Sequence, residues 1–313
     1  MLLGRTANGL YWMHRYIERA ENVARLIDAG LRMALTRASS AADEWSSVIM
    51  SAGMRPAFEQ KHSAYTARTV SEFMLRDREN PSSVLSALAS ARTNARMVRT
   101  ALTRDVWESV NGAWIGLSTL LDQPVAESDL PQVLDAIKRA MSEIRGTFHG
   151  TMLRNEIFWF SQLGTFIERA DSTARILDVK YYVLLPTVSY VGRAMDNYQW
   201  ESILRSVSAH RSYRFVYSGN YNPVQIAEYL ILDARMPRAL RFSYDNIDES
   251  LTLLAEAYGQ RFECHDGAQR TLKSLAERSI QSIFEAGLHE ALTAFITENN
   301  RLGAEIARVY NFE

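Results

Sequence analysis

Residues Leu10–Leu31, LYWMHRYIERAENVARLIDAGL, are largely repeated 150 residues later as Phe160–Tyr181, FSQLGTFIERADSTARILDVKY. Between Ile17–Asp28 and Ile167–Asp178, seven of twelve positions are identical. The identical pairs are Ile17/Ile167, Glu18/Glu168, Arg19/Arg169, Ala20/Ala170, Ala24/Ala174, Arg25/Arg175 and Asp28/Asp178. Two packed helices share the periodicity of their apolar residues because both bury one face, but packing does not require the same acids and bases at the same positions. The identical charged residues therefore indicate an internal repeat of one helix.

Helical spacing separates the repeated residues into two stripes. At 3.6 residues per turn, one stripe is apolar and a charged stripe lies along its flank. The apolar stripe consists of Ile17, Ala20, Ala24, Ile27 and Leu31, and the charged stripe of His14, Glu18, Glu21, Arg25 and Asp28. The second copy places Glu168, Asp171, Arg175 and Asp178 in the equivalent stripe. Each copy is expected to be a helix whose buried face is bordered by charge.

Two interpretations of the charged stripe remain open. In the first, Glu21 with Arg25 and Arg25 with Asp28 are ordinary pairs on one helix, worth roughly 0.2–0.5 kcal/mol each. In the second, the two helices face each other, and their acids and arginines form one partly buried network. Such a network is costly to desolvate, so it is more often kept for a ligand or a specific geometry than for stability.

The periodicity predicts an all-α protein, an elaborated antiparallel helical bundle with an internal duplication of the long charged helix. We expect one domain over residues 1–313, repeat-related helices at about 8–36 and 154–185, and a mobile insertion at 37–69. The two copies should pack near the middle about a pseudo-twofold axis. The polar cleft expected there is lined by Glu18, Arg19, Glu21, Arg25 and Asp28 with Glu168, Arg169, Asp171, Arg175 and Asp178.

Prolines mark two further helix starts. Asn80 followed by Pro81 is typical of an N-cap and a first helical turn. Pro237 is expected to begin another helix, with Arg235, Arg238 and Arg241 around the break. Backbone amides at a helix start, together with nearby arginines, can hold an anion. The alternative is that these arginines cover the protein's own helix ends and acids.

The composition sets broad limits. Of the 313 residues 47% are hydrophobic, enough for a sizeable core, and the net charge of −1 gives no reason to expect nucleic acid or an anionic membrane as a partner. The single cysteine, Cys264, excludes an internal disulfide. Without an apolar run typical of a signal peptide or a membrane span, we expect a cytoplasmic protein. Arginine supplies 31 of the 35 basic residues, a bias that GC-rich coding DNA also produces.

Several kinds of chemistry lack their motifs. The chain contains no GxxxxGK[ST] phosphate loop, no GxGxxG, no HExxH and no GxSxG. A di-iron bundle needs two Glu-x-x-His motifs, whereas only Glu59 and His62 have this spacing. We therefore predict no metal site. His14 lacks a repeated counterpart, because Gly164 takes its place, and adjacent residues such as Cys264 and His265 rarely point at one another.

The sequence resembles the bacterial Alpha-E proteins, an α-helical family long described as a domain of unknown function. The resemblance starts with LLGRTANGLYWMHRYIERAENVARLID, continues through RENPSSVLSALASARTNARMVRTAL and DVWESVN, and returns with IERADSTARILDVKYYVLLP. It extends through MDNYQWESILRSVSAHRSYR and YNPVQIAEYLILDARMPRALRFSYDNI. These segments occur in the same order as in the family and cover nearly the whole chain.

The resemblance implies a functional context. Alpha-E proteins are encoded beside, or fused to, circularly permuted ATP-grasp proteins and transglutaminase-like proteases, which are therefore the expected partners. ATP-grasp enzymes join a carboxylate to an amine through an acyl phosphate. The resemblance thus implies a component of a peptide- or amide-bond-forming system. No intrinsic cofactor is expected, and ATP would enter through the partner.

Within that system the repeated residues have expected roles. Glu18 or Glu168 is the candidate catalytic group, accepting a proton or holding an amine. Substrate carboxylate or phosphate would be held between the repeated helices by the remaining charged residues, Arg19, Glu21, Arg25, Asp28, Arg169, Asp171, Arg175 and Asp178. Whether the protein is itself an enzyme stays open. The alternative is a non-catalytic helical scaffold that binds the ATP-grasp or protease partner and uses the charges only to fix helix register.

Overall fold

The computed structural model describes residues 2–34, 41–184, 194–218 and 221–312. These residues form helices and no strand. The first half contains α1 Gly4–Ala34, α2 Ala41–Ser51, α3 Arg55–Glu59, α4 Ala67–Ser71, η1 Glu72–Arg76, α5 Val84–Met97, η2 Arg99–Ala101, α6 Arg104–Leu120, η3 Glu127–Asp129 and α7 Leu130–Thr151. The second half contains α8 Glu156–Leu184, α9 Ala194–Ser206, α10 His210–Tyr217, α11 Pro223–Ile231, α12 Leu240–Tyr258, α13 Glu263–Glu277, α14 Ile280–Glu285 and α15 Leu288–Val309.

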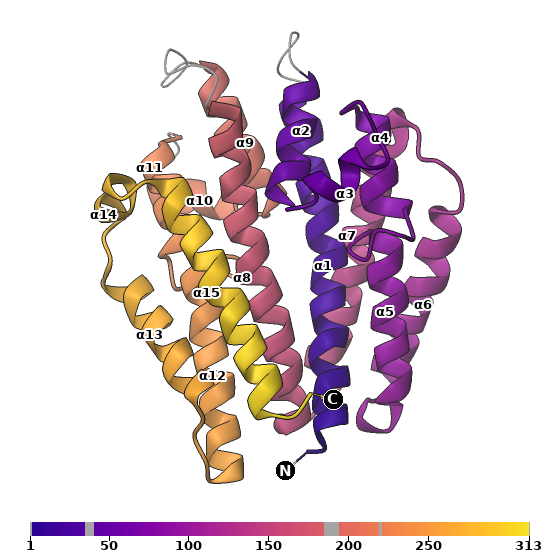
Figure 1. Ribbon diagram of the computed structural model, residues 1–313, viewed down its shortest axis with the longest axis vertical. Coiled ribbons are helices and arrows are strands. Elements are labelled where there is room, and N and C mark those ends of the chain that lie inside the picture. The colour runs from indigo at the N-terminus through magenta and orange to yellow at the C-terminus, as the bar shows by residue number, and fades with distance from the viewer. Residues whose placement is uncertain (1, 35–40, 185–193, 219–220, 313) are drawn as a thin grey trace.

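The two repeat-related helices, α1 and α8, pack against each other at the centre of the bundle (Figure 1). They run in the same direction, because residue numbers rise together along the contact. Tyr11 lies against Gly164 near the start of both helices, and Glu18 contacts Arg169 further along. The sequence-based expectation that the two copies meet in the middle is therefore confirmed.

Antiparallel helices flank α1. The residue after α5, Val98, packs on Gly9 near the start of α1, so α5 runs opposite to α1. In α7, Lys138 binds Asp28 in the last third of α1, whereas Phe148 packs on His14 in its first half. The helix α6 covers the outer side of α5 and α7.

Antiparallel helices likewise flank α8. At the end of α12, the Tyr258 hydroxyl accepts a hydrogen bond from the backbone N–H of Leu2 at 3.2 Å, at the end of the bundle where α8 begins. In α15, His289 contacts Asp178, and the Tyr310 ring just after the helix packs on Phe160 near the start of α8. Figure 1 shows α12, α13 and α15 on one side of the central pair, and α5 and α6 on the other.

Small residues allow the central helices to approach closely. Gly164 is the clearest case. At Gly164 a Cβ atom would lie closer than 3.0 Å to the backbone carbonyl oxygen of Tyr11, nearer than real Cβ atoms approach. The second copy therefore has Gly164 where the first has His14, because any side chain at this step would separate the two helices.

Two predicted helix starts were wrong by three residues. The helix α5 begins at Val84 and is capped by Ser83, not by Asn80. The Asn80 side chain instead accepts from the N–H of Ser82 at 3.0 Å and donates to the carbonyl of Phe73. Similarly, α12 begins at Leu240 and not at Pro237. Each proline therefore precedes its helix by a turn.

The all-α class is confirmed, whereas the internal duplication and the single-domain boundary stay predictions. Within the predicted insertion at 37–69, the structure describes α2, α3 and the start of α4, and 37–40 lie outside the described residues. The expected end of the second repeat helix near Pro186 also lies outside them. No helix among the described residues combines the length and the apolar content needed to cross a bilayer.

Replacing Gly164 by Ala should destabilise the protein, because the new methyl group has no room at the α1–α8 contact. Overpacking of this kind costs about 1–3 kcal/mol or more. Gly112→Ala in α6 is the matched control, since a Cβ there meets nothing within 4 Å, and it should raise the unfolding free energy by up to about 1 kcal/mol through helix propensity. Urea unfolding measures both, and equal effects would contradict the close contact.

Candidate functional site

The centre of the molecule is an exchange of charged side chains between α1 and α8. Arg169 donates to Glu18 from Nε to Oε1 and from Nη2 to Oε2, both at 3.0 Å. Arg19 donates to Glu168 in the same two-pronged way, at 2.6 Å and 3.0 Å. Each Glu-Arg dipeptide thus supplies the acid of one bidentate pair and the arginine of the other. Because bidentate pairs constrain orientation as well as distance, the exchange sets the register of the two helices.

On one side of this exchange, the acids are enclosed by the protein's own arginines. Glu18 and Glu21 have no exposed surface. Arg238, from the loop before α12, donates to Oε1 of Glu18 at 3.0 Å and to Oε1 of Glu21 at 2.6 Å. Arg145 of α7 contacts Oε2 of both acids, and Arg25 pairs with Glu21 within α1. These five residues are called the closed cluster below.

A further set of contacts is matched between the two halves. Arg25 pairs with the acid four residues before it and also donates to the backbone carbonyl of Ser206, at the end of α9. Arg175 pairs with the acid four residues before it and donates to the carbonyl of Ser51, at the end of α2, at 3.1 Å. Since α2 follows α1 as α9 follows α8, the contacts correspond when the halves are exchanged. This correspondence is what a pseudo-twofold axis would produce.

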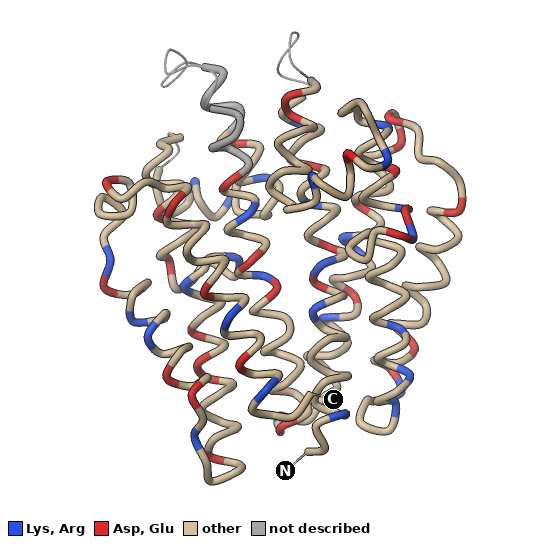
Figure 2. The backbone as a smooth tube through the Cα atoms, in the orientation of Figure 1, with Lys and Arg blue, Asp and Glu red and all other residues tan. Residues whose placement is uncertain are grey.

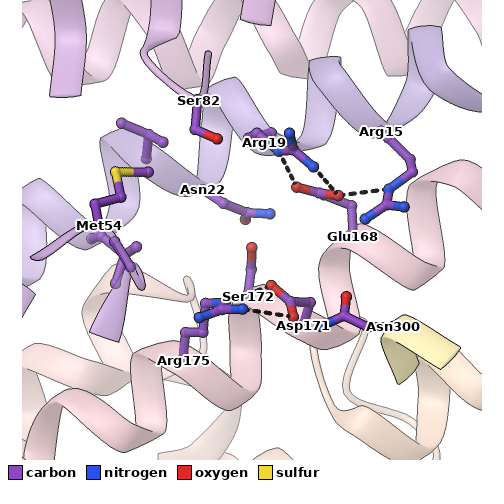
Figure 3. A pocket seen from close by; sticks show the side chains of 13 residues that line it. Arg15, Arg19, Asn22, Met54, Ser82, Glu168, Asp171, Ser172, Arg175 and Asn300 are labelled. Carbon is purple, nitrogen blue, oxygen red and sulfur yellow. Dashed lines mark hydrogen bonds and ion pairs between the residues drawn. The ribbon is translucent and has the colours of Figure 1, made fainter. Parts of the chain in front are cut away.

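On the other side of the exchange lies a cavity of about 190 Å³ between α1 and α8 (Figure 3). Five charged side chains line it: Arg15, Arg19, Arg175, Glu168 and Asp171. Three positive and two negative groups give this lining a formal charge of +1. Asn22, Ser82, Ser172 and Asn300 supply the neutral polar groups. The cavity is therefore polar, mixed in charge and slightly cationic.

Asn22 presents a hydrogen-bond donor to the cavity. Its Oδ1 accepts from Arg238 Nη1 at 3.3 Å, and because arginine only donates, the amide oxygen must face Arg238 and the Nδ2 group must face the other way. The residue is 2% exposed, and Nδ2 has no hydrogen-bond partner among the described residues. Figure 3 shows the amide pointing into the space near Arg19 and Ser172. A buried donor without an acceptor costs about 1–3 kcal/mol, so an acceptor in the cavity would be stabilised.

The pKa values of the central acids are lowered. Burial alone raises the pKa of Glu18, but Arg169, Arg238 and Arg145 outweigh burial and hold it well below its ordinary value. Burial is likewise outweighed at Glu21, mainly by Arg238, which brings the pKa to about 2. These acids are ionised at neutral pH. Acids with such low pKa values are poor proton acceptors and strong partners for cations.

The pKa of Glu168, which lines the cavity, is also lowered. Burial raises the pKa of Glu168, but the charges of Arg15 and Arg19 and their hydrogen bonds lower it below its ordinary value. Arg15 approaches Glu168 Oε2 at 2.8 Å. Glu168 therefore stays negatively charged while it lines the cavity.

The ten residues predicted to line one cleft separate into three places. Arg19, Glu168, Asp171 and Arg175 line the cavity. Glu18, Glu21, Arg25 and Arg169 lie behind it, in or beside the closed cluster. Asp28 pairs with Arg32 and Lys138, and Asp178 contacts His289, so both lie further along the helices.

The three arginines near Pro237 lie in different surroundings. Arg238 is buried and bonds to the closed cluster. Arg235 is exposed and pairs with Asp233 at 2.7 Å. Arg241 is partly buried on the first turn of α12. Arg238 thus matches the alternative interpretation, in which these arginines cover the protein's own acids.

Sequence reasoning missed six polar residues of the site: Arg15, Asn22, Ser82, Arg145, Ser172 and Asn300. Asn22 and Ser172 carried a signal, because they occupy the same step of the two copies, four residues after Glu18 and Glu168. Arg15 lies one turn before Arg19 on the same helix. Arg145 and Ser82 belong to elements outside the repeat and carried no signal.

Comparison with known proteins identifies a family. Residues 2–310 match Alpha-E, described as a predicted alpha-helical domain with a conserved ER motif. Uncharacterised proteins of Mycobacterium bovis and of two Mycobacterium tuberculosis strains are 24%, 24% and 23% identical over 273 residues, 82% of this chain. The chain spans 30% of the length of these relatives. No solved structure matches it. Glu-Arg dipeptides occur at 18–19 and 168–169, the exchange described above, and at 277–278.

Replacing Glu18 by Gln should destabilise the protein strongly. The change leaves Arg169 without its acid and leaves Glu21 as the remaining acid for Arg145 and Arg238, and breaking a buried ionic cluster typically costs about 3–5 kcal/mol. Urea unfolding measures the loss. Glu108→Gln in the exposed pair with Arg104 is the matched control and should change stability little. Similar losses in both variants would contradict the buried cluster.

Acid should destabilise the protein over two ranges of pH. Burial lowers the pKa of His14 from 6.5 to about 3. Between these values the unfolded chain binds a proton that the folded chain does not, so the unfolding free energy falls as the pH decreases, by about 1.4 kcal/mol per pH unit. Glu18, Glu21 and Glu168 have lowered pKa values, so their stabilisation is complete above pH 4.5 and is lost towards pH 2.

Urea unfolding at about pH 7, 5.5, 4 and 2.5 samples both ranges. His14→Gln should flatten the dependence in the upper range, and an unchanged slope in this variant would contradict a buried neutral histidine.

Proposed function

The chain belongs to the Alpha-E family, and from that premise we propose that it binds a small carboxylate- or phosphate-bearing molecule in the cavity between α1 and α8. It does so as a component of a bacterial peptide- or amide-bond-forming system that works with an ATP-grasp ligase and a transglutaminase-like protein. The partners come from the resemblance to the family, and the binding site comes from the geometry of the cavity.

One observation carries the binding proposal: the buried Asn22 Nδ2 group faces the cavity and needs an acceptor. A carboxylate or phosphate oxygen provides one. Arg19 and Arg15 stand on the same wall and favour a negative charge there. The helix α5 begins just after Ser82, so the positive end of its dipole adds to the same potential.

The acids divide into two roles in this proposal. Glu168 lines the cavity and keeps a low pKa, which favours holding an amine over accepting a proton. Glu18 is enclosed behind the cavity, where it holds Arg169 and Arg238 in place. We therefore assign ligand contact to Glu168 and a positioning role to Glu18.

The closed cluster favours a second candidate function, a non-catalytic scaffold for the ATP-grasp or protease partner. The five charged residues of the closed cluster pair with one another, as expected for ion pairs that fix helix register. Co-purification with the ATP-grasp partner and an amide-formation assay separate the two functions. Binding of the partner without any dependence of activity on cavity residues supports the scaffold.

Asn22→Asp tests the binding site with a nearly isosteric change. The new carboxylate still accepts from Arg238, so the protein should stay folded, but it turns an oxygen acceptor towards the cavity in place of a donor. We expect the affinity for glutarate and for inorganic phosphate, measured by isothermal titration calorimetry, to fall at least about tenfold.

The control variant is Asn8→Asp, which adds the same charge near the start of α1, away from the cavity lining. It should bind both anions as the unmodified protein does. Absence of binding to the unmodified protein, or equal binding by Asn22→Asp, would overturn the anion site.

A further inference from the structure

The loops that precede α5 and α12 occupy corresponding places in the two halves. Pro81 lies three residues before the first residue of α5, and Pro237 lies three residues before the first residue of α12. The helix α5 packs antiparallel on α1 as α12 packs antiparallel on α8. The residue after each proline is therefore equivalent: Arg238 in one half and Ser82 in the other.

The partners of Arg238 have counterparts around the cavity. Arg238 donates to Glu18, Glu21 and Asn22. The residues at the same steps of the second copy are Glu168, Asp171 and Ser172, and all of them line the cavity together with Ser82. The cavity thus lies where, in the other half, a guanidinium group bridges two acids.

The two halves also differ in charge. Glu18 and Glu21 share four arginines, Arg25, Arg145, Arg169 and Arg238. Glu168 and Asp171 share three, Arg15, Arg19 and Arg175. The acids near Ser82 are therefore surrounded by one arginine fewer than the acids near Arg238.

We propose that the cavity binds an α-amino acid, whose ammonium group takes the position equivalent to the Arg238 guanidinium, between Glu168, Asp171 and Ser172. Its carboxylate faces Asn22 and Arg19. The position of the carboxylate rests on the proposed function, and the position of the ammonium group goes beyond it. A ligand with both charges complements the mixed lining, whereas a simple anion leaves two acids opposite it and a simple cation faces three arginines.

Three probes that differ by one group test the ammonium position and the carboxylate position separately. L-Glutamate carries the ammonium and the carboxylates, glutarate lacks the ammonium, and 4-aminobutyrate lacks the α-carboxylate. By isothermal titration calorimetry, glutamate should bind roughly tenfold or more tightly than either of the others. Glutarate binding as tightly as glutamate overturns the ammonium position and leaves the anion site standing. Absence of binding by all three overturns both.

Ser82→Arg tests the position directly, because it restores the arginine that the other half has. The variant should keep or raise the melting temperature and lose glutamate binding at least about tenfold. Thr93→Arg, which adds the same charge at an exposed step of α5, should bind glutamate normally. Glutamate binding by Ser82→Arg at the original affinity overturns the proposal.

A second variant keeps the test decisive if Ser82→Arg does not fold. Asp171→Asn removes one acid from the ammonium position and leaves Asn22 and Arg19 in place. Its affinity for glutamate should fall to the level of glutarate, while its affinity for glutarate stays the same or rises. An equal loss for both ligands contradicts a separate ammonium position.

Discussion

The structure depends on two bidentate ion pairs that cross the contact between α1 and α8. Glu18 receives a bidentate pair from Arg169 of the other helix, and Glu168 receives one from Arg19. A shift of either helix by one residue breaks both bidentate pairs and leaves buried charges with fewer partners, which is more costly than an apolar mismatch. The parallel arrangement and the close approach at Gly164 follow from this constraint. The flanking helices then pack on a centre whose register is already set.

The same exchange explains why the two sides of the centre differ. Both sides have a pair of acids and a set of arginines, and both signs of charge are interspersed over the helices as a whole (Figure 2). Behind the exchange, Arg238 fills the space and completes the closed cluster. In front of it, Ser82 is too small to do so, and a cavity lined by the same kinds of side chain results. A local difference of one side chain thus separates a structural cluster from a candidate binding site.

The sequence was sufficient to predict the helical class from its periodicity, and identical charges at identical steps of two helices predicted that the two helices meet. It placed Arg19, Glu168, Asp171 and Arg175 in one cleft, together with six other charged residues. It could not separate them from Glu18 and Arg25, since residues on one stripe differ in burial only after the flanking helices are placed. Arg145 and Ser82 come from elements without periodic signal, and their contributions depend on loops whose paths are set by tertiary packing. The start of α5 was misplaced because Asn80 bonds to the loop and not to the helix.

The long separation between the partners of Glu18 has a consequence for biosynthesis. Arg169 follows Glu18 by 151 residues and Arg238 follows it by 220. At about 5–20 residues per second, a ribosome needs roughly 10–45 s to make the intervening chain up to Arg238. During that interval, the acids of the emerging first helix have only part of their native set of arginines. The closed cluster therefore cannot be completed before Arg238 has been translated, so the first half of this fold depends on a residue of the second half.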